Sequence, residues 1–211
     1  MNDDFSALKL MTYSGRGITL GMTLKGEPFV GYTLTGRSPS SQARKLVYDE
    51  TNFIIRTQVT DEEQLRKGNA ALLIYPAIVA TEGRILVSNG AQTRLLVGAV
   101  KFNRAINPVN ILSKAFDRPI VEEGIDLCSY EPDTPNFTPR ISACIDNEMG
   151  CFYIIKRVGE SKLVELWPFE LKPRNASIFT TYKGGNENPL LSFEGAPLEA
   201  IVESLTAEEI C

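Results

Sequence analysis

A polar break between two apolar runs, "YTLTGRSPSSQARKLVYD" at 32–49, carries the first residues that could do chemistry. Arg37 and Arg44 enclose serines, a proline, a glutamine and an alanine, and no acidic residue lies between them. The planar fork of a guanidinium can bind phosphate through two hydrogen bonds, and hydroxyls such as that of Ser38 add donors. The loop therefore predicts a local site for a small anion. The open alternative is that both arginines are surface residues without a partner.

Tyr75 and Asn89 are candidates for moving a proton or orienting a substrate. Tyr75 belongs to "IYP" at 74–76, inside a strongly apolar run, where a tyrosine is often a core residue with a satisfied hydroxyl. Asn89 and Gly90 belong to "VSNGAQT" at 87–93, which ends a strand and opens a helix. Asn-Gly is also the commonest short hairpin turn, so this pair could simply reverse the chain.

The loop "CSYEPDTPNFTPRISACI" at 128–145 adds acids, hydroxyls and another arginine. Its candidates are Glu131, Thr138 and Arg140, and the last two lie where the loop runs into a strand. Glu131 and the nearby Asp133 would ordinarily be solvated loop acids. Taken by themselves, these segments indicate an α+β domain that binds a small anion.

Composition removes several classes of chemistry. The chain contains no histidine, which excludes Ser-His-Asp and Cys-His catalysis and any histidine-ligated metal. Its four cysteines form no C-x-x-C pair, so neither a zinc ribbon nor a redox motif is expected. Cys144 and Cys151 lie in apolar runs and are predicted to be buried thiols. We expect neither a metal site nor a cofactor.

Charge and hydropathy limit the partners. The net charge of −4 and the pI near 5.1 argue against nucleic acid. No apolar run approaches the roughly 20 residues of a membrane-spanning helix. The start "MNDDFSALKL" lacks the features of a secretory signal, so we expect a cytoplasmic protein. With 211 residues and no repeat or linker, the chain predicts a single domain over 1–211.

Short apolar segments rich in Ile, Val, Phe, Tyr and Thr dominate the chain, and Gly, Asn, Asp or Pro bound them. Expected strands lie at 17–24, 28–34, 45–49, 52–59, 71–80, 84–88, 140–146, 150–158, 162–169 and 176–182. Apolar residues at helical spacing predict helices at 91–103, 107–117 and 196–210. The second of these helices has Asn107 as its expected N-cap and Pro108 at its first position.

The order along the chain is therefore strands, two helices, strands and one helix. Blocks of consecutive strands favour antiparallel sheets, and the helices are expected on the outer faces of those sheets. The predicted fold class is α+β.

Taken in order, several of these segments resemble the archaeal-type IMP cyclohydrolase family. The matching segments are "YSGRGI" (13–18), "GYTLTGRSPSSQAR" (31–44), "IYP" (74–76), "RILVSNGAQT" (84–93), "YEPDTPNFTPRISACI" (130–145) and "LSFEG" (191–195). Each segment is short, and their shared order across most of the chain is what makes the resemblance specific. Residues 1–12 precede the first segment as an N-terminal extension.

The resemblance implies an αββα four-layer sandwich like that of the N-terminal-nucleophile hydrolases, with two stacked antiparallel sheets between outer helices. It also implies a reaction, the ring closure of 5-formamidoimidazole-4-carboxamide ribotide (FAICAR) to IMP with loss of water. This is the last step of purine synthesis, and its substrate is a small purine ribotide. No cofactor or metal is implied, because the carboxamide nitrogen attacks the formyl carbon within one molecule.

The same resemblance assigns catalytic roles to three residues through their motifs. Tyr75 would donate toward the formyl oxygen, and the Asn89 amide would polarise and orient that oxygen. Glu131 would be the carboxylate that transfers the proton. A positioned acid or base commonly contributes about 10²–10⁴ to a rate.

Substrate binding is assigned in the same way. The expected binding residues are Arg37, Ser38, Arg44, Gly90, Thr138 and Arg140. Arg37 and Arg44, with the hydroxyls and amides between them, would hold the ribotide phosphate. Arg140 would bind the base or brace its loop, and the sequence leaves both roles open.

Two other functions remain open on the sequence. A purine-ribotide sensor would keep the fold and bind IMP without forming it. An amide hydrolase of the same broad fold would expose Thr12 or Ser14 by cleavage upstream. The sequence also leaves open whether copies of the chain form a homo-oligomer.

Overall fold

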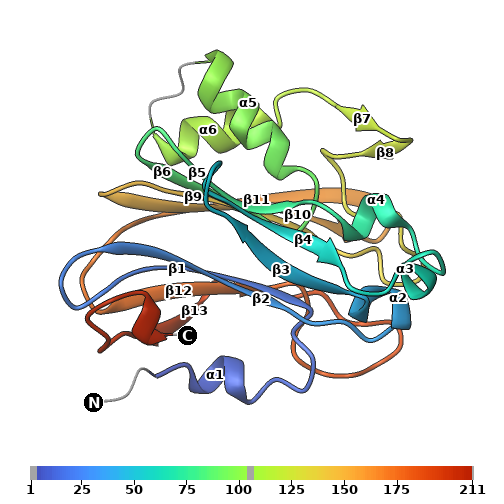
Figure 1. Ribbon diagram of the computed structural model, residues 1–211, viewed down its shortest axis with the longest axis horizontal. Coiled ribbons are helices and arrows are strands. Elements are labelled where there is room, and N and C mark those ends of the chain that lie inside the picture. Colours follow the sequence, from blue (N-terminus) through green and yellow to red (C-terminus); the bar gives the residue numbers. More distant parts are fainter. Residues whose placement is uncertain (1–3, 104–106, 211) are drawn as a thin grey trace.

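Two antiparallel sheets face each other in the computed structural model, which describes residues 4–103 and 107–210 (Figure 1). The smaller sheet has the order β13-β12-β1-β2, formed by Leu198–Ile201, Asn175–Thr180, Arg16–Met22 and Pro28–Leu34. The larger sheet has the order β11-β10-β9-β6-β5-β4-β3, formed by Ser161–Glu170, Met149–Val158, Arg140–Ile145, Arg84–Ser88, Pro76–Thr81, Ile54–Val59 and Arg44–Asp49. A separate short hairpin pairs β7 (Val121–Glu122) with β8 (Ile125–Asp126).

Two longer helices, α5 (Thr93–Asn103) and α6 (Pro108–Ala115), cover the outer face of the larger sheet (Figure 1). As predicted, the Asn107 side chain caps α6 by accepting a hydrogen bond from the Asn110 N–H at 2.9 Å. The other helices are short: α1 (Ser6–Lys9), α2 (Pro39–Gln42), α3 (Glu62–Leu65), α4 (Ala70–Leu73) and the 3-10 helix Glu208–Ile210. Within the described ranges, every helix falls short of the length and hydropathy that crossing a membrane requires.

The larger sheet carries a separate apolar core on each face, because successive residues of a strand point to opposite sides. In β6, Val87 belongs to the core between the two sheets, whereas Leu86 belongs to the core under α5 and α6. Aromatic rings fill the centre between the sheets. The Phe152 ring lies 4.9 Å from that of Phe179 and 5.9 Å from that of Phe169, measured between centroids.

The structure confirms the predicted antiparallel sheets, with strands close to most of the expected ranges and helices at two of the three. The range 71–80 differs at its start. Its first residues form α4, because the Asn69 side chain accepts a hydrogen bond from the Ala71 N–H and so starts a helical turn. The strand itself, β5, begins only at Pro76.

The helix predicted at 196–210 is wrong. Residues Leu198–Ile201 instead form β13, which pairs with β12 at the edge of the smaller sheet. Burial there alternates as in a strand, since Ala200 and Val202 are buried and Ile201 is 52% exposed. The pairing available along β12 therefore overrides the helical spacing.

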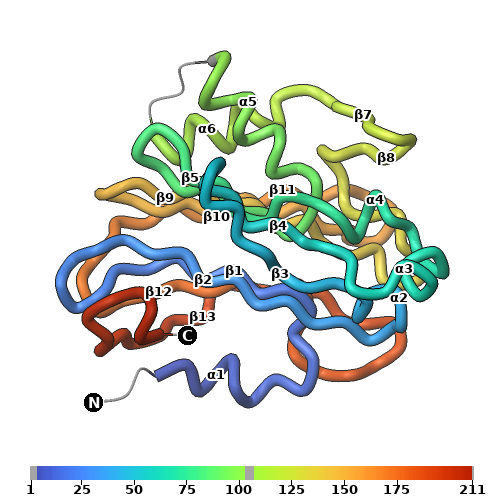
Figure 2. Tube along the Cα trace, in the orientation of Figure 1, coloured from blue at the N-terminus to red at the C-terminus, as the bar shows by residue number. Residues whose placement is uncertain are grey.

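Because no helix forms at 198–201, the layer that covers the smaller sheet is thinner than expected. In the described chain, α1 and the 3-10 helix pack there, where Phe5 and Ile210 contact a small apolar cluster around Val202. The N-terminal and C-terminal segments lie together on that side (Figure 2). Asp4 and Ile201 form an isolated antiparallel β-bridge between backbones there. The helices are thus concentrated over the larger sheet.

We predict that Phe152→Ala lowers the free energy of unfolding by about 3–5 kcal/mol, because it opens a cavity between the sheets. Phe102→Ala is the matched control, since the Phe102 ring is 84% exposed on α5. Its loss is expected to change stability by less than about 0.5 kcal/mol. Urea denaturation of both variants measures the difference, and equal losses would contradict the position of Phe152 in the core.

Candidate functional site

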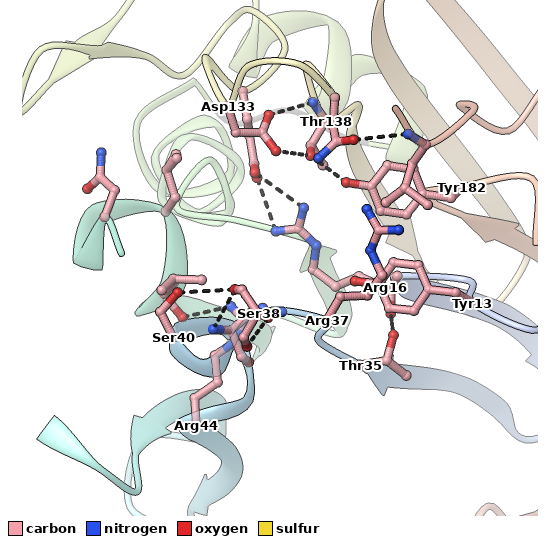
Figure 3. A pocket seen from close by; sticks show the side chains of 18 of the residues that line it. Tyr13, Arg16, Thr35, Arg37, Ser38, Ser40, Arg44, Asp133, Thr138 and Tyr182 are labelled. Carbon is pink, nitrogen blue, oxygen red and sulfur yellow. Dashed lines mark hydrogen bonds and ion pairs between the residues drawn. The ribbon is translucent and has the colours of Figure 1, made fainter. Parts of the chain in front are cut away.

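A cavity of about 410 Å³ opens at one end of the two sheets (Figure 3). Its walls come from the chain entering β1, the β2–β3 connection with α2, the segment of α4, the loop that precedes β9 and the segments that follow β12. Its charged lining consists of Arg16, Arg37, Arg44, Glu131 and Asp133. Hydroxyl groups of serine, threonine and tyrosine account for much of the remaining wall. The cavity is therefore polar and suited to a ligand that carries both anionic and hydrogen-bonding groups.

A buried ion pair between Arg16 and Glu131 forms part of the wall. Nη1 and Nη2 of Arg16 donate to Oε1 and Oε2 of Glu131 at 3.1 and 3.3 Å, in a bidentate arrangement. Nη1 also donates to the Asn89 carbonyl at 2.7 Å. Burial alone would lower the pKa of Arg16, but the Glu131 carboxylate and the phenols of Tyr75 and Tyr32 raise the pKa well above its usual value.

Arg140 lies behind this pair and is not part of the cavity lining. Its Nε donates to the Ser129 carbonyl and its Nη1 to Gln92 Oε1, both at 2.8 Å, and Nη1 lies 3.8 Å from Glu131 Oε1. Burial lowers the pKa of Arg140, and the nearby Glu131 opposes that shift. A Cβ on Gly90 would lie 2.9 Å from Arg140 Nη1, so only glycine leaves room for the guanidinium. Arg140 and Gly90 thus support the Glu131 loop from behind.

Arg44 faces the cavity with a fixed guanidinium. Its Nε donates to the Ser41 carbonyl at 3.1 Å, and its Nη1 donates to the Leu73 carbonyl at 2.9 Å. Nη1 also lies 3.5 Å from the Tyr75 hydroxyl. Among the described residues, Nη2 of Arg44 has no hydrogen-bond partner, so a charged donor remains available to a ligand.

Arg37 reaches the cavity from the exposed side. Its Nη1 donates to Asn186 Oδ1 and to the Glu187 carbonyl, each at 3.1 Å, and its guanidinium carbon lies 5.4 Å from the centroid of the Tyr13 ring. Both acceptors are neutral oxygens, and hydrogen bonds to charged groups are generally stronger. An anion in the cavity could therefore compete for this side chain.

Ser38 organises the short helix between the two arginines. Its Oγ accepts from the Ser41 N–H at 3.2 Å, and Ser41 Oγ accepts from the Ser38 N–H at 3.0 Å, which makes a capping box. A Cβ on Gly36 would lie 2.5 Å from Ser41 Oγ, so glycine is needed for this close approach. The box holds the hydroxyls of Ser38 and Ser40, 3.1 Å apart, at the cavity beside Arg44.

Tyr75, expected at the reacting groups, lies behind the cavity wall. It is 2% exposed, and its hydroxyl lies 3.0 Å from that of Tyr32 and 3.5 Å from Arg44 Nη1. Burial raises the pKa of Tyr32, and the adjacent Tyr75 raises it further. The structure therefore links Tyr75 to the cavity through Arg44.

Asn89 is likewise fully buried behind the wall. Its Nδ2 donates to the Pro139 carbonyl at 2.8 Å, while its Oδ1 accepts from the Ile141 N–H and from Gln92 Nε2, both at 2.9 Å. The side-chain amide thus joins the end of β6 to β9. Asn89 contacts the cavity lining through its backbone carbonyl, which accepts a hydrogen bond from Arg16.

Thr138 belongs to a row of hydrogen-bonded side chains on the cavity wall opposite Ser38 and Arg44 (Figure 3). Its hydroxyl contacts Asp133 Oδ2 and lies 2.6 Å from the Tyr182 hydroxyl, while its N–H donates to Asp133 Oδ1 at 2.7 Å. Burial raises the pKa of Asp133, and the negative charge of Glu131 raises it further. Burial also raises the pKa of Tyr182, to about 12.

Arg16 and Tyr182 line the cavity although no sequence pattern had indicated them, and Asp133, expected to be a solvated loop acid, lines it as well. Arg16 stands in "YSGRGI" at the start of a strand whose seven residues are all buried, and an arginine in that position needs a buried partner. No comparable local signal marks Tyr182, which follows β12 as one more tyrosine in an apolar run.

The buried thiols agree with their prediction. Cys144 and Cys151 are fully buried; burial raises the pKa of the Cys151 thiol to about 12 and that of Cys144 well above its usual range. Neither thiol lines the cavity. Across residues 4–103 and 107–210, no group of three or more Cys, Asp or Glu side chains is arranged to hold a metal ion.

The fold and the cavity define a class of protein in which two facing antiparallel sheets carry, at one end, a cavity lined by three arginines and two carboxylates. The family described as IMP cyclohydrolase-like protein matches residues 13–210, and the chain belongs to it. This match spans every segment that lines the cavity.

Curated relatives agree with this family. The chain is 27% identical to the IMP cyclohydrolase of Methanocaldococcus jannaschii over 90% of its own length and 84% of that protein. It is 28% identical to the IMP cyclohydrolase of Methanococcus maripaludis strain S2, over 73% of this chain and 69% of that protein. A third relative, the IMP cyclohydrolase of M. maripaludis strain C7, is 24% identical over 90% of this chain and 86% of that protein. The relatives are named as enzymes of one activity.

We predict that Arg16→Met lowers the free energy of unfolding by about 3–5 kcal/mol, because it leaves the Glu131 carboxylate buried without its main partner. The double variant Arg16→Met/Glu131→Met should recover part of this loss, since neither charge then remains buried. Chemical denaturation of the single and double variants measures the coupling. A double variant that loses the full sum of the single effects would contradict a coupled ion pair.

The control for this cycle is the surface pair between Arg66 and Glu62, whose side chains are 78% and 76% exposed. Arg66→Met is expected to change stability by less than about 0.5 kcal/mol. A similar loss in the two arginine variants would mean that burial is not the cause.

Proposed function

We propose that this protein is an IMP cyclohydrolase that closes the second ring of FAICAR to give IMP with loss of water. One observation carries the proposal: in a single cavity, the Glu131 carboxylate is aligned by Arg16 and faces the arginine and serine wall of the β2–β3 connection. Family membership and the names of the relatives support the same reaction. The volume of about 410 Å³ is within the range of roughly 300–1,000 Å³ that is usual for small-molecule sites.

The reaction makes few demands on side-chain chemistry. The formyl group must be held against the carboxamide nitrogen, and such alignment can contribute roughly 7–11 kcal/mol in intramolecular reactions. One proton must leave the nitrogen, one must reach the formyl oxygen, and the developing charge on that oxygen needs a donor. A chain without histidine can meet these demands with carboxylates, hydroxyls and guanidinium groups.

The phosphate of the ribotide is proposed to bind at Arg37, Arg44 and the hydroxyls of Ser38 and Ser40. The free Nη2 of Arg44 and the exposed guanidinium of Arg37 supply charged donors from two sides of this wall. The capping box keeps both serine hydroxyls beside Arg44. Binding energy at the phosphate would then hold the reacting end near Glu131.

Glu131 is proposed to take the proton from the carboxamide nitrogen. Bidentate hydrogen bonding to Arg16 fixes the plane of the carboxylate and keeps a positive charge beside it. The same guanidinium is a donor for the negative charge that develops on the substrate.

Tyr75 and Asn89 are proposed to act through arginines. The Tyr75 hydroxyl is within reach of Arg44, and the Asn89 carbonyl accepts from Arg16. Gly90 and Arg140 support the Glu131 loop from behind. These are positioning roles, because none of the four lines the cavity.

The facing sheets also support two finer proposals about the fold. We propose that the core is that of an αββα sandwich like the N-terminal-nucleophile hydrolases, with its outer layer on one side reduced to short helices. The core between the sheets draws on strands from both halves of the chain, which supports a single domain over 1–211.

The first test supplies FAICAR to the purified protein and follows IMP by chromatography. Glu131→Gln is expected to lower kcat by about 10²–10⁴ with little change in KM, because it keeps the shape and removes the base. Tight IMP binding without turnover in the wild type would contradict the enzyme and identify a ribotide sensor. Normal turnover in Glu131→Gln would remove Glu131 from the mechanism.

Arg37→Ala is expected to raise KM by about 10-fold or more while kcat changes little, since a hydrogen bond to a charged group is worth about 1.5–3 kcal/mol. Arg66→Ala, which removes the same charge from an exposed surface site, serves as the control. Steady-state kinetics with FAICAR measure both values. Loss of kcat with unchanged KM in Arg37→Ala would contradict the phosphate assignment.

A further inference from the structure

Three side chains outside the assigned catalytic set form a continuous hydrogen-bonded chain on the cavity wall (Figure 3). Asp133 and Thr138 come from the loop before β9, and Tyr182 follows β12. The Thr138 hydroxyl lies between the other two, in contact with Asp133 Oδ2 and 2.6 Å from the Tyr182 oxygen. All three residues line the cavity that also contains Glu131.

The protonation state of Asp133 sets the direction of this chain. An ionised carboxylate only accepts, so Thr138 must donate its single proton to Asp133 and accept one from Tyr182. The Tyr182 oxygen then offers only lone pairs to a ligand. A protonated Asp133 can donate to Thr138, which frees Thr138 to donate to Tyr182 and Tyr182 to donate into the cavity. One proton added at Asp133 thus becomes available at Tyr182.

The surroundings of Asp133 favour the protonated form more than those of an ordinary loop acid. Burial raises the pKa of Asp133, the carboxylate of Glu131 raises it further, and the hydrogen bonds from Thr138 oppose this. The charged and titratable groups that face Asp133 are Glu131, Arg16, Arg140 and Tyr182. Two carboxylates in one cavity therefore have different environments, as an acid and base pair requires.

The Tyr182 ring is held firmly in place. It stacks on Tyr13 with centroids 5.7 Å apart. Gly15 has a positive φ of 72°, and a Cβ there would lie 2.7 Å from the Tyr182 ring. Glycine at this position therefore lets the backbone pack directly against the ring.

We propose that Asp133, Thr138 and Tyr182 form a proton relay that protonates the formyl oxygen of the substrate while Glu131 deprotonates the carboxamide nitrogen. This inference rests on the proposed function and extends it. Tyr182 is the catalytic residue of the relay, because it would touch the reacting oxygen. Thr138 and Asp133 act through Tyr182.

The protons balance over the two chemical steps. Ring closure forms the bond between the carboxamide nitrogen and the formyl carbon, moves one nitrogen proton to Glu131 and puts the Tyr182 proton on the formyl oxygen. Thr138 then restores the Tyr182 proton and Asp133 restores that of Thr138, which leaves Asp133 ionised. Loss of water then breaks the carbon–oxygen bond. Protonated Glu131 gives its proton to the leaving hydroxyl, and the proton released from the formamido nitrogen passes through Tyr182 and Thr138 to Asp133. This second exchange returns Glu131 and Asp133 to their starting states.

The test compares Tyr182→Phe and Asp133→Asn with the wild type and with Glu131→Gln, using FAICAR as substrate. Tyr182→Phe keeps the ring and is expected to lower kcat about 100-fold, with KM changed by less than about 3-fold. Tyr153→Phe removes a tyrosine hydroxyl on the opposite face of the larger sheet and is the matched control. Thermal unfolding of each variant reports whether its fold is retained.

The pH profile separates a relay from a structural role. Asp133 must hold its proton to start the relay, so wild-type kcat should fall as pH rises through the raised pKa of Asp133. Asp133→Asn should lose this alkaline limb and show a uniformly low kcat, whereas Tyr153→Phe should keep the wild-type profile. An unchanged alkaline limb in Asp133→Asn would overturn the role of Asp133.

The outcomes distinguish this inference from the function on which it rests. A wild type that forms IMP, with Tyr182→Phe as fast as the wild type, would overturn the relay and leave the cyclohydrolase intact. A raised KM with unchanged kcat in Tyr182→Phe would also overturn it, and would assign the hydroxyls to substrate binding. A wild type that forms no IMP would overturn both proposals.

Discussion

The buried contact between Arg16 and Glu131 is the interaction on which the rest of the site depends. Arg16 is the first residue of β1 in the smaller sheet, and Glu131 belongs to the loop that enters β9 of the larger one. Their bidentate hydrogen bonds, with the bond from Arg16 to the Asn89 carbonyl, tie the two sheets together at the end where the cavity opens. Burying two charges is costly, and only close geometry with further hydrogen bonds offsets that cost. The polar groups around the ion pair must therefore keep their positions, because they supply those hydrogen bonds.

The cost of burying the charges of Arg16 and Glu131 explains why many buried polar residues surround a small cavity. Asn89 joins β6 to β9 through its side-chain amide, and Gln92 links Asn89 to Arg140, whose charge lies behind Glu131. These hydrogen bonds pair buried donors with buried acceptors, whereas Nη2 of Arg140 is buried without a partner among the described residues. Tyr75 and Asn89, which the family resemblance marks as catalytic, thus lie outside the cavity lining and contact arginines that belong to it.

Local patterns in the sequence predicted most strands and the two longer helices, because alternation, helical spacing and the Asn107 cap are all local properties. The segment at 196–210 failed, since its apolar spacing fits a helix while a free edge of β12 selects a strand. For the site, the composition of the loop at 32–49 indicated Arg37 and Arg44, whereas Glu131 was assigned through the family resemblance, and all three line the cavity. Local sequence patterns could not predict that Arg16 is the partner of Glu131, because Arg16 lies 115 residues away in the chain. Tyr182 and Thr138 are separated by 44 residues and meet only through the fold.

The two carboxylates of the cavity show how one fold can give similar groups different surroundings. Glu131 faces guanidinium groups, and its two oxygens are held by charged donors. Asp133 lies only two positions further along the same loop, yet its oxygens face a hydroxyl and a backbone N–H, and burial raises its pKa. The difference lies in their partners, which are Arg16 for Glu131 and the hydroxyl and N–H of Thr138 for Asp133. In the proposed mechanism a proton is held at Asp133 and another is accepted at Glu131, so a site without histidine would still contain both an acid and a base.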